Sequence, residues 1–248
     1  MKVSESYQKA YNSQYDDSIR EWRKLGAKYK AENIIRLAKT ITFKNVIEVG
    51  CGTGDILHYL SEQGFSSELY GVEISESGIK QVKEKNIKHL KDVLLFDGYK
   101  IPFPDNYFDL AVCSHVLEHV EHERLFLREV LRVSKNQIFE VPIDFSFFVD
   151  NKINHYLSYG HINIYTPSLL KFLLKTEGVK VKDEIFFLYP TPILKEIYKQ
   201  KIKYFTAKAK NLILKTIPSL RKIKPQSYAV LTSKSEQKTT IFTPNIHL

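Results

Sequence analysis

The sequence predicts an α/β domain built on a doubly wound, mainly parallel sheet. Short β-branched runs alternate with segments whose apolar residues recur at the three-to-four spacing of a helix face. A glycine-rich turn follows the first of these runs and precedes a helical pattern, as at the carboxyl end of a parallel strand. The chain has 248 residues, of which 43% are apolar and 26% charged, so it is long enough to bury a large core.

Seven strands are expected, and most are separated by helices. The strands are expected at residues 45–49, 69–74, 93–96, 108–113, 138–141, 179–189 and 227–232. Helices are expected within 1–40 and at 56–63, 75–86 and 121–133. A further helix is expected to begin with Thr166 as its N-cap and Pro167 at its first position, and to end at Gly178. This alternation implies helices on both faces of the sheet.

Cysteine content and hydropathy indicate the compartment. The only two cysteines, Cys51 and Cys113, cannot form a disulfide framework, which fits a reducing environment. No stretch of 18 apolar residues is present, and residues 1–23 lack the apolar core of a signal peptide. We therefore expect a cytoplasmic protein.

The basic residues are concentrated in one segment. Residues 190–225 contain ten lysines and arginines and one acid, Glu196, which accounts for the net charge of +9 of the whole chain. Their apolar residues have approximately helical spacing, with lysines on the remaining faces. The segment is predicted to be a basic amphipathic insertion of two helices, broken near Pro218, before the last strand.

The glycine-rich turn is the most informative motif. Residues 46–55 read Val-Ile-Glu-Val-Gly-Cys-Gly-Thr-Gly-Asp, with glycines at alternate positions after a strand. Glycine lets the backbone turn tightly and approach a ligand closely. In the dinucleotide-binding fingerprint the third glycine follows the second by three residues, whereas Gly54 follows Gly52 by two. This spacing argues against a nicotinamide enzyme.

Two acidic residues follow the next two strands. Glu73 comes nineteen residues after Gly54, at a strand end where a carboxylate can accept both hydroxyls of a ribose. Asp97 follows Phe96, where it could accept a hydrogen bond from an adenine amino group while the apolar neighbour packs on the ring.

These motifs, in this order, resemble the class I S-adenosylmethionine-dependent methyltransferases, especially the small-molecule branch with ubiquinone-type and sugar O-methyltransferases. The resemblance covers roughly residues 40–189. The matching residues are Glu48, Gly50, Gly52, Gly54, Glu73, and the stretches 96–98, 101–110 and 113–120. The resemblance implies a Rossmann-like methyltransferase fold, with seven strands and the last one antiparallel, and S-adenosylmethionine as cofactor.

The resemblance also implies a cofactor site. In this family the glycine loop lies against the amino-acid end of the cofactor, the acid matching Glu73 binds the ribose, and the acid matching Asp97 contacts the adenine. The expected cofactor-binding residues are Glu48, Gly50, Cys51, Gly52, Gly54, Asp55, Glu73, Ile74, Phe96, Asp97 and Ser114.

The expected domain organisation follows from the same resemblance. Residues 1–40 form an N-terminal helical lid, since relatives often close the cofactor pocket with such a helix; plain core packing is the alternative. Tyr11 and Tyr15 are its candidate closing residues. Residues 41–235 form the methyltransferase domain, which includes the insertion at 190–225, and residues 236–248 form a tail.

Histidines are the candidate catalytic residues. His115 and His119 are one helical turn apart, and His161 lies in the long loop after the fifth strand. Each could remove the proton of an acceptor hydroxyl, and structural packing or capping is the alternative role. Ubiquinone-type relatives have a Glu-x-x-Glu-His pattern thought to hold a divalent metal. Here His115 takes the first place of that pattern, and no metal is expected.

The loop after the fifth strand also supplies the candidate substrate-binding residues His155, Tyr156 and Tyr159. Nucleic-acid amino-methylating relatives carry an Asp/Asn-Pro-Pro-aromatic motif after the fourth strand, whereas this chain has Cys113-Ser114-His115-Val116. A small-molecule acceptor is therefore expected, and nucleic acid is disfavoured.

Three roles are open for the basic insertion: a solvated helix pair, an interfacial helix on anionic lipid, or an RNA-contacting surface. Lysine outnumbers arginine nine to one, which disfavours base-specific recognition. The function predicted is methyl transfer to an oxygen of a small or lipid-linked acceptor, with a surface-polysaccharide sugar as the specific hypothesis. The alternatives are an RNA methyltransferase and a non-catalytic cofactor-binding scaffold. The location would be the cytoplasm, with contact at the inner membrane surface through residues 190–225.

Overall fold

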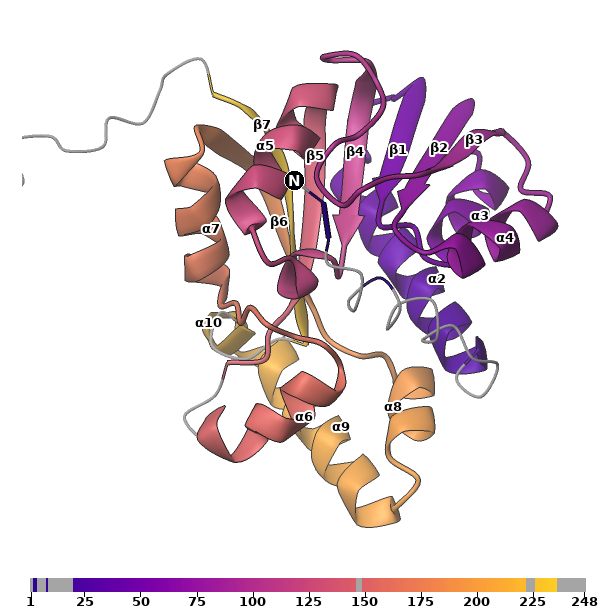
Figure 1. Cartoon of the computed structure of the whole chain (residues 1–248). Coiled ribbons are helices and arrows are strands. Elements are labelled where there is room, and N and C mark those ends of the chain that lie inside the picture. The colour runs from indigo at the N-terminus through magenta and orange to yellow at the C-terminus, as the bar shows by residue number, and fades with distance from the viewer. Residues whose placement is uncertain (1, 4–7, 9–19, 146–148, 222–225, 236–248) are drawn as a thin grey trace, which may run out of the picture.

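The computed structural model describes residues 2–3, 8, 20–145, 149–221 and 226–235. Its centre is a seven-stranded sheet in the order β3-β2-β1-β4-β5-β7-β6 (Figure 1). The strands are β1 (Asn45–Val49), β2 (Glu68–Glu73), β3 (Leu90–Leu95), β4 (Phe108–Ser114), β5 (Ser134–Pro142), β6 (Val179–Phe187) and β7 (Ser227–Lys234). Strands β1 to β5 pair in parallel, and β7 is antiparallel to both β5 and β6. The predicted fold class and the antiparallel last strand are confirmed.

Helices cover both faces of this sheet. The covering helices are α2 (Arg20–Leu37), α3 (Asp55–Glu62), α4 (Glu76–Glu84), α5 (Glu123–Val133) and α7 (Pro167–Thr176). Helices α2, α3 and α4 bury apolar side chains on one face, and α5 and α7 bury theirs on the other. Successive strand residues point to opposite faces, so Val46 packs with α2, α3 and α4, whereas Ile47 packs on the face covered by α5 and α7. The doubly covered sheet explains why its strands are apolar almost throughout.

The helix after the long loop begins as its sequence predicts. The Thr166 side chain accepts a hydrogen bond from the Leu169 amide at 3.1 Å, and Pro167 occupies the first helical position. Gly178 follows the helix with φ 72°, in the left-handed region that glycine enters without strain. This helix, α7, packs against the sheet through Leu170 and Leu174.

The N-terminal region is only partly described. Within it, α2 buries Ala31, Ile34 and Leu37 in the core, so this part of the helix packs on the sheet as a core element. Tyr11, Tyr15 and the tail at 236–248 lie outside the described residues. The lid therefore stays a prediction for the segment that precedes α2.

Over its described residues, 190–221, the basic insertion contains three helices rather than the two predicted: α8 (Thr191–Ile197), α9 (Lys201–Thr216) and the short α10 (Pro218–Arg221). The predicted break near Pro218 is confirmed, since α9 ends at Thr216 and α10 begins at Pro218. Proline is favoured at the first position of a helix. The unforeseen break lies between Ile197 and Lys201, in a basic and polar stretch.

Small elements gather at the carboxyl ends of the parallel strands. They are η2 (Leu117–His119), η3 (Val149–Lys152) and α6 (Ile153–Ser158); α6 lies below the sheet in the view of Figure 1. Asn211 of α9 donates a hydrogen bond to the Tyr189 carbonyl at 2.7 Å, which ties the insertion to the end of β6. In the described part of the chain, no helix is long and apolar enough to cross a membrane.

Candidate functional site

The glycine loop joins β1 to α3 at the carboxyl edge of the sheet. Gly50, Gly52 and Gly54 have φ values of 75°, 53° and 74°, all in the left-handed region. The Gly50 amide donates to the Val72 carbonyl at 2.8 Å, so the loop continues the β1–β2 pairing before it turns. Gly54 is the N-cap of α3, and its left-handed conformation directs the loop into that helix. The loop therefore presents backbone amides at the edge where open α/β sheets bind ligands.

Glu73, the last residue of β2, fixes the conformation of this loop. Its Oε2 accepts a hydrogen bond from the Gly52 amide at 2.8 Å, and its Oε1 accepts one from the Ser75 amide at 3.1 Å. The side chain is only 3% exposed. The sequence predicted a ribose-binding carboxylate here, and the structure gives the same carboxylate a role in shaping the loop.

A cavity of about 270 Å³ lies at the ends of β2 and β3. Its lining includes Ile74, Phe96 and Asp97, three of the predicted cofactor-binding residues. The Asp97 Oδ1 accepts hydrogen bonds from the Tyr99 and Lys100 amides at 2.8 and 2.6 Å, which hold its carboxylate in place. An apolar wall with a carboxylate at its rim suits a purine base.

Residues from the N-terminus cover one side of this cavity. The Val3 amide donates to the Asp97 carbonyl at 2.9 Å, and the Gln8 side-chain amide donates to the Ile74 carbonyl at 3.0 Å. Both residues line the cavity with Lys2. Lys2, Val3 and Gln8 thus contact the predicted adenine end.

The other predicted cofactor residues differ in their surroundings. Glu48 is buried in β1, and burial raises the pKa of its carboxyl well above the usual range, an effect that nearby Lys30 opposes. Cys51 is also buried, and its Sγ lies beside Gly71 of β2, so only its backbone can face a ligand. Asp55 pairs with Lys85 at 2.6 Å.

A buried polar network underlies the loop after β4. The Glu140 carboxylate, on β5, accepts hydrogen bonds from Asn33 of α2 at 3.2 Å, Ser114 of β4 at 2.9 Å and Ser227 of β7 at 2.8 Å. Three donors satisfy this buried carboxylate and lock four elements together. The Ser114 hydroxyl, a predicted cofactor contact, is engaged in this network.

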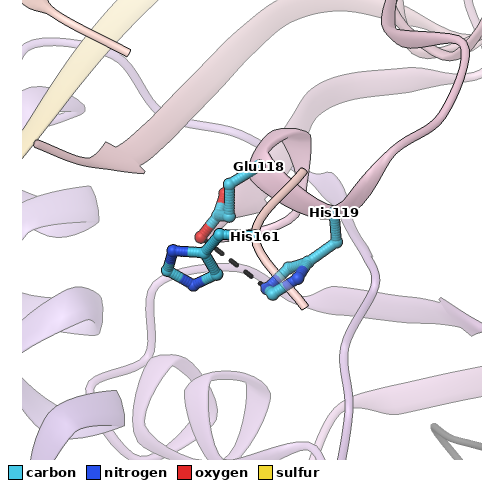
Figure 2. A group of neighbouring side chains, drawn as sticks. All are labelled: Glu118, His119 and His161. Carbon is cyan, nitrogen blue, oxygen red and sulfur yellow. Dashed lines mark ion pairs between the residues drawn. The ribbon is translucent and has the colours of Figure 1, made fainter. Parts of the chain in front are cut away.

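The three predicted catalytic histidines come together at the ends of β4 and β5. His115 follows β4 with φ 57°, a left-handed conformation that is uncommon for a residue other than glycine. His119 and His161 have ring centroids 4.9 Å apart, and both lie next to Glu118 (Figure 2). We call His115, Glu118, His119, Asp144 and His161 the acceptor cluster.

Backbone hydrogen bonds bring the two segments of the acceptor cluster together. The Ile162 and Asn163 amides donate to the Glu118 carbonyl at 2.8 and 3.0 Å. The Asn163 side chain donates to the Leu117 and Val120 carbonyls at 3.0 and 2.7 Å. The loop after β5 is therefore fixed to η2.

Hydrogen bonds also set the tautomers of two histidines. His119 Nδ1 lies 2.9 Å from the Gly160 carbonyl, and His161 Nδ1 lies 2.6 Å from Asp144 Oδ2. A carbonyl and a carboxylate only accept hydrogen bonds, so Nδ1 carries the hydrogen in both rings. In the neutral rings the lone pair is then on Nε2.

Burial dominates the electrostatics of the acceptor cluster. It raises the pKa of Glu118 above its usual range, and lowers the pKa of His119, while the pKa of His115 falls to about 3. For His161, burial is the largest single effect and lowers the pKa, but the hydrogen bond to Asp144 and the negative charges of Glu118 and Asp144 together outweigh it, so the pKa lies above its ordinary value. His115 is thus neutral near pH 7.

The predicted substrate-binding residues lie on and after α6. His155 and Tyr159 are exposed, and their rings lie 5.0 Å apart. Tyr156 is buried and donates a hydrogen bond to the Asp144 carbonyl, so its hydroxyl supports the acceptor cluster.

Two members of the acceptor cluster were not among the predicted site residues. Glu118 is the second acid of the Glu-x-x-Glu-His pattern, for which no metal was expected, and Asp144 was missed. The available signal for Asp144 was its position two residues after Pro142, at the carboxyl end of a predicted parallel strand.

The glycine loop and the acceptor cluster meet at Val116. A Cβ atom on Gly50 would lie 2.7 Å from Val116 Cγ2, so the residue between His115 and Leu117 packs directly on the loop. The two ends of the candidate site are therefore adjacent.

Comparisons with known proteins agree with this geometry. Residues 47–137 match a family model described as a methyltransferase domain. The ubiquinone/menaquinone biosynthesis C-methyltransferase UbiE of Paraburkholderia xenovorans is 33% identical over 93 residues. That match covers 36% of this chain and 38% of the relative, so the chain matches well under half of the relative's length.

Solved structures share the fold over most of the chain. An S-adenosylmethionine-dependent methyltransferase from Archaeoglobus fulgidus has a TM-score of 0.58 and 24% identity, covering 87% of this chain and 97% of that one. The [4+2]-cyclase SpnF has a TM-score of 0.61 and 15% identity, and the match covers 84% of this chain and 81% of the cyclase. The fold alone therefore leaves the reaction open. Residues 47–137 are thus similar to a methyltransferase domain, and the chain shares its fold with S-adenosylmethionine-dependent methyltransferases.

Proposed function

We propose that the protein transfers the methyl group of S-adenosylmethionine to a hydroxyl oxygen of a small, lipid-linked acceptor. The observation that carries this proposal is the contact of the glycine loop with the acceptor cluster through Val116. A donor site and a group of histidines meet there, at the carboxyl edge of the sheet.

The residues of the donor end fit the cofactor. The cavity lined by Ile74, Phe96 and Asp97 is close to the lower limit of about 300 Å³ for ligand pockets, which suits the adenine rather than the whole molecule. Glu73 lies at the end of β2 beside it, where it would meet the ribose, and the glycine loop would hold the amino-acid end. The cofactor supplies an electrophilic methyl on a sulfonium, and the protein supplies alignment.

At the other end, the acceptor cluster would take up the proton of the acceptor hydroxyl. The O–H bond of the acceptor breaks, an O–CH₃ bond forms, and the S–CH₃ bond breaks to leave S-adenosylhomocysteine. A neutral histidine lone pair aimed into the site is the group required for this proton transfer. The Nδ1–H bonds of His119 and His161 place their lone pairs on Nε2 and so support this role.

The acceptor class is tested by methyl transfer from radiolabelled S-adenosylmethionine to lipid-linked sugars, to quinone precursors and to RNA. We expect label in a base-stable methyl ether of a lipid-linked sugar. UbiE is named a C-methyltransferase, so label on a ring carbon of a quinone precursor would contradict O-methylation. Label in RNA would contradict the small-molecule acceptor.

The lipid-linked acceptor is proposed because α9 exposes apolar side chains among lysines. Ile202 is 80% exposed, Phe205 60% and Leu212 63%, and α9 contains no acid. Such a face suits an anionic lipid surface, and α9 lies below the sheet, toward the end at which β4 finishes (Figure 1).

We expect the protein to cosediment with vesicles that contain phosphatidylglycerol, and much less with vesicles of phosphatidylcholine alone. Replacing Phe205 and Leu212 with serine should weaken vesicle binding by at least about 10-fold, since each buried apolar side chain contributes about 1.5–3 kcal/mol. Leu169→Ser with Phe172→Ser on α7 is the matched control, because these side chains are 50% and 62% exposed. Equal binding to both vesicle types, or loss with the control, would contradict membrane contact through α9.

A further inference from the structure

Three side chains of the acceptor cluster form a compact set of metal-ligand atoms. One ligand atom each from Glu118, His119 and His161 lies within 4.8 Å of the others (Figure 2). They come from two segments, η2 and the loop after β5. Ligand atoms of one zinc ion lie at most about 4 Å apart, so a small rotation of these side chains would bring them onto a common ion.

The Glu118 carboxylate has an unusual environment. Its side chain is 1% exposed, and neither oxygen accepts a hydrogen bond from any described residue. The nearest basic groups are His115 Nδ1 at 3.4 Å and His119 Nε2 at 3.9 Å from Oε1. A buried carboxylate without hydrogen bonds is costly, and such groups are usually paired or bound to a metal. The carboxylate is therefore positioned as a ligand rather than as part of the polar network around Glu140.

The two histidines are oriented as metal-binding histidines usually are. Metal-ligating histidines donate the other ring N–H to a carbonyl or carboxylate, which fixes the tautomer and the ring. His119 donates from Nδ1 to the Gly160 carbonyl, and His161 from Nδ1 to Asp144. His119 Nε2 lies on the Glu118 side of its ring. Both histidines thus have the supporting contact that orients a metal-binding ring.

We infer that Glu118, His119 and His161 bind a divalent transition-metal cation, with Asp144 and the Gly160 carbonyl as the groups that orient the two histidines. Two imidazoles and one carboxylate are the donor set of catalytic zinc sites that keep an open coordination position. This set includes His161 from the distant loop and omits His115, so it differs from the contiguous Glu-x-x-Glu-His pattern.

The role of this ion rests on the proposed function. With the ion bound, Nε2 of His119 and of His161 is engaged as a ligand, so His115 is the histidine of the acceptor cluster that would take up the proton. The ion would assist this step by lowering the pKa of a hydroxyl that approaches its open position. The binding of the ion itself is independent of which acceptor is used, and it can be measured without any acceptor.

The test is titration of the metal-free full chain with zinc chloride by calorimetry, and with cobalt chloride by visible absorption. We expect one zinc ion to bind per chain, and the visible spectrum of bound cobalt to indicate a low coordination number of the ion. His161→Ala and Glu118→Gln should each weaken zinc binding by at least about 100-fold, and Asp144→Asn by about 10- to 100-fold. His122→Ala, an exposed histidine at the start of α5, is the matched control and should leave zinc binding unchanged.

His115→Ala distinguishes the proposed site from the contiguous pattern, because His115 belongs to that pattern and is not one of the three proposed ligands. This variant should retain zinc binding, as His122→Ala should. Binding of S-adenosylhomocysteine to each variant reports whether the fold and the donor end are intact. If Glu118→Gln does not bind S-adenosylhomocysteine, the zinc affinity of Asp144→Asn is used instead, because Asp144 only orients His161 and is not itself a ligand. The absence of zinc binding in the wild type, or unchanged binding in His161→Ala, would overturn the inference. A protein that binds zinc but transfers no methyl group would refute the proposed function alone.

Discussion

Gly52→Val is expected to weaken binding of S-adenosylmethionine by about 30-fold or more. Gly52 has φ 53°, and a β-branched residue in this left-handed conformation costs about 1–3 kcal/mol. The loop would relax to another conformation and lose the bond from the Gly52 amide to Glu73. Binding must then restore the glycine-loop geometry, and a cost of about 2 kcal/mol corresponds to about 30-fold in affinity. Calorimetric titration of the variant measures this loss.

Gly64→Val is the matched control for backbone strain. Gly64 has φ 62°, follows α3, and would place a Cβ in open space. This variant should lose thermal stability but retain its affinity for S-adenosylmethionine. Affinity within about threefold of wild type for Gly52→Val would show that the glycine loop does not hold the cofactor.

The second large effect concerns the acceptor cluster. His161→Ala should lower kcat for methyl transfer by about 100-fold or more, because proton removal assisted by a positioned group contributes about 10²–10⁴. The affinity for S-adenosylmethionine should be unchanged, since His161 lies outside the glycine loop and the adenine cavity. Single-turnover rates at saturating cofactor isolate the chemical step from cofactor binding.

Asp144→Asn should produce a smaller loss of kcat than His161→Ala. An asparagine side chain can still accept the Nδ1–H bond through its oxygen, so the ring orientation is kept while the negative charge is lost. His58→Ala on α3 is a suitable control, because this histidine is partly exposed and pairs with Glu62 of the same helix. Full activity of His161→Ala would remove the acceptor cluster from the reaction.

Much of the sheet could be predicted because its signals are local. The apolar run of β1 ends at alternate glycines, and the Thr166-Pro167 pair marks the start of α7. Such features depend on the residues themselves and their immediate neighbours. Glu73 and Asp97 could be placed near the glycine loop because each lies at or just after the end of a parallel strand, and parallel strands end at one edge of the sheet.

The missing parts of the site depend on contacts between distant segments. Asp144 and His161 pair across 17 residues, and the Ile162 and Asn163 amides of the loop after β5 donate to the carbonyl of Glu118 in η2. Likewise, the Glu73 bond to Gly52 spans 21 residues and gives the carboxylate a structural role that spacing does not reveal. Sequence patterns locate candidate side chains, whereas burial and hydrogen-bond partners arise from the tertiary fold.

The central claim is that the glycine loop, Glu73 and the cavity at Asp97 bind S-adenosylmethionine. Its most direct test is calorimetric titration of the wild-type chain with S-adenosylmethionine, S-adenosylhomocysteine and NAD⁺, repeated with Glu73→Ala. We predict micromolar binding of the first two ligands, no binding of NAD⁺, and loss of binding in the variant. A folded wild-type protein that binds neither S-adenosyl compound, or that prefers NAD⁺, would contradict this assignment.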